Sequence, residues 1–125
     1  MLEDEFTELF LEKFSGEGDV ISFAKGRVAL YAGLKASKIP EGSEILVPAY
    51  TCVVVASAVM FAGYRPVYVD ICPRTYNIDV SKLPPATNAA AMIVQHSYGI
   101  PADMQVLSAA ASSFLQLVSP PCVRK

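Results

Sequence analysis

Short β-branched runs alternate with an alanine-rich run over residues 45–95, and this alternation constrains the fold more than any other feature. Residues Val53 to Ala62 have the composition of a helix, and Gly63 follows them as a typical C-terminal cap. Strands are expected over residues 45–49, 66–71 and 91–95. Strands that alternate with helices form right-handed βαβ units around a parallel sheet. The sequence therefore predicts an α/β fold with mainly parallel strands and flanking helices.

Two further helices are expected before this unit. Residues 2–14 place phenylalanine and leucine side chains on one face and glutamates elsewhere, which is the pattern of an amphipathic helix. A glycine-rich turn at 16–19 and a short extended piece at 20–23 follow it. Gly26 then precedes a helical stretch that runs to about Ala36.

Composition and charge exclude several classes of function. The apolar fraction is 53%, above the usual range of about 45–50%, which fits a piece of a larger α/β core. A net charge of −2 without a basic cluster argues against a nucleic-acid partner. A single histidine and no CxxC spacing predict neither a metal site nor a disulfide framework. The three cysteines, together with an acidic start at residues 3–5 that is wrong for a secretory signal, indicate the cytoplasm.

The uncharged stretch 45–64 admits a different interpretation. It contains 20 residues, which is the length of a membrane-spanning helix, so a small membrane protein is one alternative. Pro48 would fall in the first turn of such a helix, and the β-branched start differs from the alanine-rich second half. A strand followed by a helix, without membrane contact, explains the stretch better.

Four motifs follow one another along the first 104 residues. They are GRVAL at 26–30, VPAYTC at 47–52, PVYVDI at 66–71 and QHSYGIPADM at 95–104. In this order they resemble the DegT/StrS-type sugar-nucleotide aminotransferases, which are pyridoxal 5'-phosphate (PLP) enzymes of fold type I. The resemblance implies that residues 1–107 form the N-terminal part of an aspartate-aminotransferase-like large domain. Residues 108–125 are then a divergent tail of the kind that a frameshift or truncation leaves.

The tail itself has helical composition over residues 108–118, and Ser119-Pro120-Pro121 would break that helix. Relatives, as the resemblance implies, continue here through a helix into a further strand that carries an acidic motif.

The resemblance assigns cofactor contacts to Gly26, Arg27, Val28 and Cys52. Free N–H groups at a helix N-terminus favour a phosphate, and glycine allows its close approach. The family usually has Ser-Gly-Thr at this position, so Arg27 replaces a hydroxyl that helps to hold the phosphate. Cys52 falls where relatives place an aromatic residue over the PLP ring, although it has the character of a small buried apolar residue as well. Tyr50 is a second candidate for the pocket, with a buried ring as the commoner outcome.

The histidine and tyrosine of the last motif, His96 and Tyr98, follow the third expected strand at its carboxyl end. Open parallel sheets place their ligands at that edge. A structural role for His96 is nevertheless the more common outcome for a lone histidine. Asp103 is expected to cap the following helix, and Asp70 to form a turn.

The residues that PLP chemistry needs most have no counterpart in the chain. The family's pyridine-nitrogen aspartate lies on a later strand, and no aspartate follows Asp103. Its Schiff-base lysine lies later still, and no lysine here stands in a matching context. The lysines are Lys13, Lys25, Lys35, Lys38, Lys82 and Lys125. No catalytic residue is therefore predicted, and covalent PLP catalysis has no route.

Two interpretations remain beside the membrane alternative. The first is a truncated PLP-dependent aminotransferase-like protein that is inactive alone. Its parent family transfers an amino group, typically from glutamate, to a keto sugar nucleotide. The second is a non-catalytic interaction protein that pairs with a full-length homologue, because family members form dimers with active sites at the interface. The same reasoning allows a homodimer.

Overall fold

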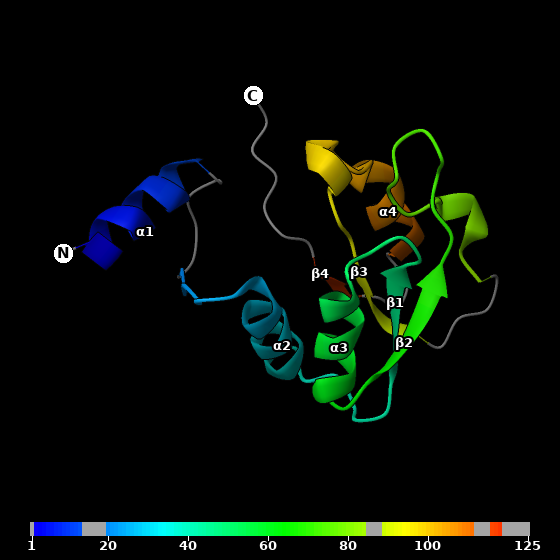
Figure 1. Ribbon diagram of the computed structural model, residues 1–125, viewed down its shortest axis with the longest axis horizontal. Coiled ribbons are helices and arrows are strands. Elements are labelled where there is room, and N and C mark those ends of the chain that lie inside the picture. Colours follow the sequence, from blue (N-terminus) through cyan, green and yellow to red (C-terminus); the bar gives the residue numbers. More distant parts are fainter. Residues whose placement is uncertain (1, 14–19, 85–88, 112–115, 119–125) are drawn as a thin grey trace.

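The computed structural model describes residues 2–13, 20–84, 89–111 and 116–118 (Figure 1). Its helices are α1 (Leu2–Lys13), α2 (Gly26–Ala36), α3 (Val53–Phe61) and α4 (Met104–Ala111), with short 3-10 turns η1 (Val80–Lys82) and η2 (Ser97–Gly99). Its strands are β1 (Glu44–Pro48), β2 (Arg65–Val69), β3 (Ala89–Ile93) and β4 (Gln116–Val118). Residues 20–23 belong to no helix or strand. The expected turn at 16–19 and the break at 119–121 lie outside the described residues.

The four strands form one sheet in the order β2-β1-β3-β4, and every neighbouring pair is parallel. Glu44 lies opposite Arg65 at the start of β1, and Pro48 lies opposite Val69 at its end. The predicted βαβ arrangement is confirmed, with each strand beginning one or two residues earlier than expected. Because the strands are parallel, all of their carboxyl ends lie at the same edge of the sheet.

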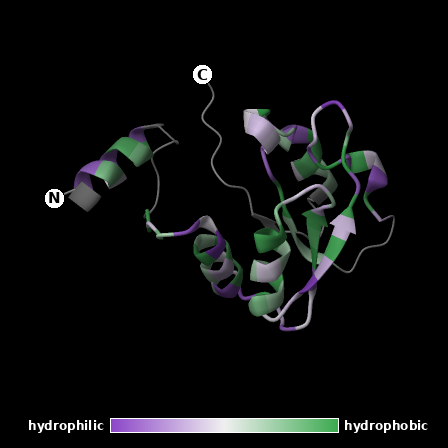
Figure 2. Cartoon of the chain, viewed as in Figure 1, coloured by the Kyte–Doolittle hydropathy of each residue, from purple (hydrophilic) through white to green (hydrophobic). Residues whose placement is uncertain are grey.

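Helices cover both faces of this sheet (Figure 1). On one face α2 and α3 pack against β1 and β3, in a buried cluster that includes Leu34, Ile45, Val47, Val59 and Ile93. On the other face α4 and η1 enclose a second buried cluster that includes Leu46, Met92, Val94 and Leu107. Neighbouring residues of β1 thus alternate between two apolar layers, so this strand is hydrophobic almost throughout (Figure 2).

The stretch 45–64 is not one helix. It contains β1, a turn and α3, which ends at Phe61 with Ala62 as its cap residue. Gly63 has a φ of +87°, and its N–H donates to Met60 O while that of Tyr64 donates to Val59 O. This left-handed glycine closes the helix as predicted. Within the described ranges, no helix is long and apolar enough to cross a membrane.

The tail departs from its prediction. The helical interpretation of residues 108–118 is confirmed only as far as Ala111, where α4 ends, and is wrong for residues 116–118, which form β4 beside β3. Ala91 lies opposite Gln116, and Ile93 lies opposite Val118. An unpaired edge of β3 offers main-chain hydrogen bonds to any strand that reaches it. This long-range pairing outweighs the local helical preference of the run.

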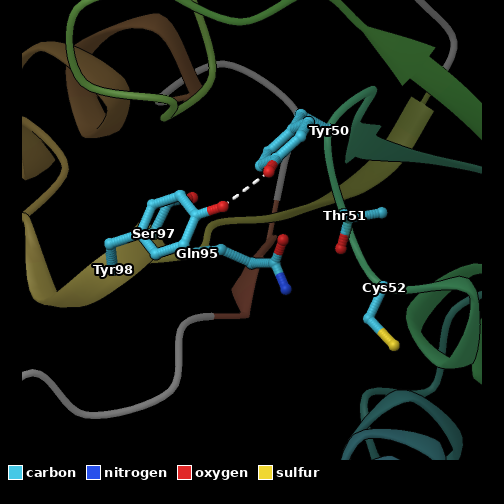
Figure 3. A pocket seen from close by; sticks show the side chains of 6 residues that line it. All are labelled: Tyr50, Thr51, Cys52, Gln95, Ser97 and Tyr98. Carbon is cyan, nitrogen blue, oxygen red and sulfur yellow. Dashed lines mark hydrogen bonds between the residues drawn. The ribbon is translucent and has the colours of Figure 1, made fainter.

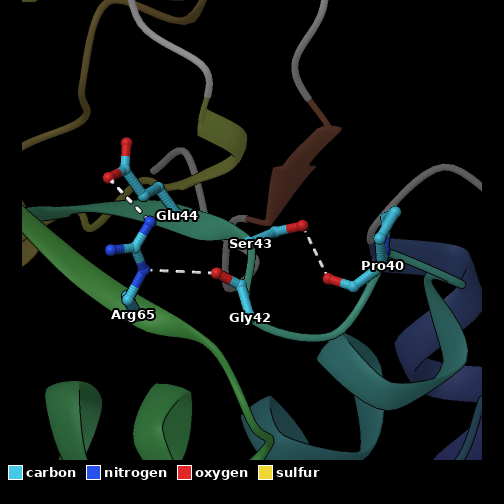
Figure 4. Close-up of polar contacts among 5 residues, drawn as sticks. All are labelled: Pro40, Gly42, Ser43, Glu44 and Arg65. Atoms are coloured by element: carbon cyan, nitrogen blue, oxygen red, sulfur yellow. Dashed lines mark hydrogen bonds and ion pairs between the residues drawn. The ribbon is translucent and has the colours of Figure 1, made fainter.

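The amino edge of the sheet is held by surface contacts (Figure 4). The Arg65 guanidinium forms an ion pair with Glu44 at 3.2 Å and donates to Gly42 O at 3.3 Å. Ser43 Oγ donates to Pro40 O at 2.6 Å. These exposed contacts tie β1 to β2 and contribute little net stability.

Candidate functional site

A pocket opens at the carboxyl edge of the sheet, between the loop after β1 and the segment after β3. Its volume is about 410 Å³. Figure 3 shows its lining side chains, which are Tyr50, Thr51, Cys52, Gln95, Ser97 and Tyr98. These lining residues include no lysine, arginine, aspartate or glutamate. The prediction that the carboxyl edge carries the pocket is thus consistent with the geometry of the described chain.

Three tyrosines converge at one side of this pocket. The hydroxyls of Tyr50 and Tyr98 share a hydrogen bond of 2.5 Å (Figure 3). Tyr76, from the loop after β2, packs its ring against both, with centroid distances of 5.6 Å to Tyr50 and 5.7 Å to Tyr98. The hydrogen bond from Tyr50 raises the pKa of the Tyr98 hydroxyl, and a charged Tyr50 would raise it further. Tyr98 is therefore a neutral hydroxyl at physiological pH. We call these three residues the tyrosine cluster.

A buried asparagine fixes the loop that carries Tyr98. Asn77 is 4% exposed, its Oδ1 accepts the Ser97 N–H at 2.9 Å, and its Nδ2 donates to Ile100 O at 3.0 Å. Ser97 Oγ also donates to the main-chain oxygen of Tyr76 at 2.9 Å. The loop after β2 and the loop after β3 are therefore joined by three hydrogen bonds, which position the tyrosine cluster.

His96 and Asp103 of the last motif, and Asp70 of the motif at 66–71, have structural roles. His96 Nδ1 accepts the Ala102 N–H at 3.0 Å, which confirms a structural role for that nitrogen. Asp103 Oδ1 accepts the Val106 N–H at 3.1 Å, so the predicted cap of α4 is confirmed. Asp70 Oδ1 accepts the Ile71 N–H at 2.8 Å, as expected of a turn former.

Two residues differ from what their type suggests. Tyr50 is 49% exposed and lines the pocket, so the expectation of a buried ring is wrong. Cys52 is an exposed free thiol at the N-terminus of α3, rather than a small buried apolar residue. Both follow β1 at the carboxyl edge, where the chain leaves the sheet before turning into α3. Sequence reasoning missed Gln95, Ser97 and Thr51, although their places next to strand ends were the available signal.

The start of α2 is a separate part of the site. Gly26, Arg27 and Val28 do not line the pocket. The Val28 N–H donates to Lys25 O at 2.9 Å, and Ala29 N–H donates to the same oxygen at 3.2 Å. No acceptor among the described residues takes the N–H of Gly26 or Arg27. A Cβ at Gly26 would meet nothing within 4 Å, so the space beside the Gly26 Cα is open.

The loop after β2 holds a second free thiol, Cys72. The nearby main-chain N–H groups of Arg74 and then Thr75, followed by the Thr75 hydroxyl, stabilise the thiolate and so lower the pKa of this thiol. A lowered pKa gives a larger thiolate fraction at neutral pH, and the thiolate is the reactive form. We therefore expect the rate at which iodoacetamide alkylates Cys72 to rise with pH, with a lower midpoint pH in the folded chain than in urea. Peptide mass mapping of a Cys52→Ser variant measures this, and equal midpoints in both states would contradict it.

Among the described residues, no group of three potential ligands could hold a metal ion. Thr51 Oγ1 is buried and forms no hydrogen bond with any described group, so it is an unsatisfied polar atom beside the pocket.

A family model described as the DegT/DnrJ/EryC1/StrS aminotransferase family matches residues 2–118. The chain belongs to this family. Its fold is a partial aspartate-aminotransferase-like large domain, and the family is one of PLP-dependent sugar aminotransferases.

Two curated relatives illustrate the match. UDP-2-acetamido-2-deoxy-3-oxo-D-glucuronate aminotransferase of Pseudomonas aeruginosa is 39% identical over 118 residues, which cover 91% of this chain and 33% of the relative. UDP-N-acetyl-3-dehydro-alpha-D-glucosamine 3-aminotransferase of Acidithiobacillus ferrooxidans is 36% identical over 99 residues, which cover 78% of this chain and 27% of the relative. This family member therefore spans about a third or less of the relatives' length.

A solved structure supports the same fold. NtdA from Bacillus subtilis, with bound cofactor PMP, superposes on this family member with a TM-score of 0.80 at 29% identity. The alignment covers 93% of this chain and 27% of that one.

The described residues fit one end of PLP. The free N–H groups of Gly26 and Arg27, at the positive end of the α2 dipole, suit a phosphate. Cys52 can offer its thiol to a ring. Among the described residues, no lysine and no carboxylate lines the pocket.

Proposed function

We propose that this chain is the cofactor-phosphate-binding N-terminal part of a PLP-dependent sugar aminotransferase and is inactive alone. The observation that carries the proposal is the pair of free N–H groups at Gly26 and Arg27, in a member of this family. The curated relatives are named for amino transfer to UDP-linked keto sugars. A sugar nucleotide and an amino donor such as glutamate are therefore the proposed substrates of the complete site.

Gly26 and Arg27 would hold the phosphate of PLP through their main-chain N–H groups. The Arg27 side chain is exposed, and its positive charge adds attraction without the hydroxyl that the family usually has here. The Val28 N–H donates to Lys25 O, so it supports the turn and does not contact the phosphate. Cys52 would contact the cofactor ring, as a smaller replacement for an aromatic side chain.

PLP, when bound, supplies an electron sink for bonds at the amino-bearing carbon. This chain's residues would bind and orient it, and would shield one side of the ring from water. A lysine and a carboxylate have to come from elsewhere, because neither lines the described pocket. We therefore infer that activity requires pairing with a full-length homologue, because a second copy of this chain would bring no lysine in a matching context. The free thiols Cys52 and Cys72 are consistent with a reducing cytoplasm.

The test is a phosphate titration followed by NMR. Inorganic phosphate is expected to shift the amide signals of Gly26 and Arg27 more than any others. Arg27→Ala should weaken binding about two- to five-fold, because one charge near a helix N-terminus has a modest effect. Lys82→Ala removes an exposed charge away from α2 and should leave binding unchanged. Shifts that cluster elsewhere, or an equal loss in both variants, would contradict the assignment.

A further inference from the structure

We propose that the tyrosine cluster and the pocket beside it bind the pyranose ring of the substrate's sugar. Tyr50 and Tyr98 would contact the ring directly, and Tyr76 would act as a positioning residue behind them. The identity of the sugar as part of a nucleotide-linked substrate rests on the proposed function. The existence of a carbohydrate subsite rests on the geometry of the cluster.

The cluster exposes aromatic surface that a folded chain would otherwise bury. Tyr50, Tyr76 and Tyr98 are 49%, 41% and 73% exposed, yet they come from three different loops and meet at one point. Tyrosine rings offer a flat apolar face together with a polar tip. The C–H groups of a pyranose ring pack on such a face, while its hydroxyls need hydrogen-bond partners nearby.

The backbone holds two of these rings in an unfavourable conformation. Tyr76 and Tyr98 have φ values of 57° and 55°, in the left-handed region that bulky residues rarely adopt. Such conformations persist where the surroundings impose them, and they concentrate at ligand sites. The hydrogen bonds of Asn77 to Ser97 and Ile100 supply that constraint here.

The rest of the lining suits a neutral polyol. Gln95 offers an amide, and Ser97 offers a hydroxyl oxygen, so donors and acceptors are both present without an opposing charge. Thr51 Oγ1 has no hydrogen-bond partner in the described structure. Figure 3 shows the Gln95 amide below the two tyrosine hydroxyls, on the side of the pocket between Tyr98 and Thr51. A phosphate would instead require cations or free N–H groups, which lie at the start of α2.

The size of the pocket limits what it can hold. At about 410 Å³ it lies near the lower end of small-molecule sites. This space accommodates one sugar ring on its tyrosine side, and both the nucleotide and the cofactor ring at Cys52 would extend beyond that ring.

Ligand-observed saturation-transfer NMR on the chain without PLP tests the proposal. The probes are UDP-N-acetylglucosamine, UDP alone and the methyl glycoside of N-acetylglucosamine. Sugar ring protons should receive more saturation than uracil protons, and the methyl glycoside should compete. The chain contains no tryptophan, so the aromatic saturation comes from its tyrosines and phenylalanines.

Tyr98→Asn is the main variant, because asparagine tolerates the left-handed conformation and removes the ring. We expect it to weaken sugar binding about ten-fold, since aromatic contacts of this kind have effects of that order. Tyr98→Phe keeps the ring, loses the hydroxyl and should weaken binding less. Tyr68→Asn makes the same replacement at an exposed tyrosine on β2 and should change nothing.

Three results would overturn the proposal. They are no saturation of any sugar proton by the folded chain, equal losses in the Tyr98 and Tyr68 variants, or saturation centred on uracil and dependent on Tyr98. Phosphate binding at α2 is measured separately. Sugar binding without phosphate binding would therefore refute the proposed function alone, and the reverse would refute only the sugar subsite.

Discussion

Incubation of the purified chain with PLP, followed by borohydride reduction, is expected to label no single lysine stoichiometrically. The chain is also expected to transfer no amino group from glutamate to a keto sugar nucleotide. The reason is the pocket, whose described lining includes no lysine and no carboxylate. Lys35 lies in the last turn of α2, where its Nζ is 3.4 Å from Ala62 O, and is thus directed toward the end of α3 away from the pocket. Lys25 precedes α2 and is exposed.

Digestion and mass spectrometry measure the labelling. A full-length relative supplied with PLP is the positive control for the chemistry. Scattered low labelling of surface lysines agrees with the expectation, because exposed amines react slowly with any aldehyde. One fully labelled lysine, together with glutamate-dependent amino transfer by the chain alone, would refute it. Activity of a full-length homologue that changes when the chain is added, compared with the homologue alone, would support pairing instead.

The elements that local sequence determines were predictable. The strands at 44–48 and 65–69 follow β-branched runs, and α3 ends at a glycine whose left-handed conformation could be expected. The tail was not predictable in this way. Residues 116–118 become a strand only because the edge of β3 is available, and such pairing has no local signature.

The same distinction between local and long-range features applies to the candidate site. The motif of residues 95–104 indicated the carboxyl edge, and the capping role of Asp103 followed from its place before a helix. The tyrosine cluster could not be inferred, because the Tyr50–Tyr98 hydrogen bond joins residues 48 positions apart. Asn77 was missed for the same reason, since its side chain reaches Ser97 and Ile100 from another loop.

Asn77→Ala is expected to be the most destabilising polar substitution in this region. It leaves the Ser97 N–H and the Ile100 carbonyl without their partners at a site that is 4% exposed. Unsatisfied buried groups of this kind cost about 1–3 kcal/mol each, so a loss of about 2–4 kcal/mol in the free energy of unfolding is expected. Urea denaturation followed by circular dichroism measures it.

Asp79→Ala is the matched control on the same loop. Asp79 Oδ1 accepts hydrogen bonds from the Ser81 N–H and hydroxyl on the exposed surface, so water can replace them and the loss should be much smaller. Hydrogen exchange separates a local effect from a global one. Faster exchange at Ser97 with unchanged protection in β1 would show that Asn77 holds the loop rather than the core. Equal losses in the two variants would contradict the role assigned to Asn77.

The same substitution links stability to binding. If Asn77 fixes the loop that carries Tyr98, its loss should release the strained left-handed backbone and separate the Tyr50 and Tyr98 hydroxyls. Sugar saturation should then fall in Asn77→Ala even at urea concentrations at which the chain remains folded. The phosphate-induced shifts at Gly26 should persist, because neither side-chain hydrogen bond of Asn77 involves α2. A variant that loses both signals together would show that the two halves of the site depend on one folding unit.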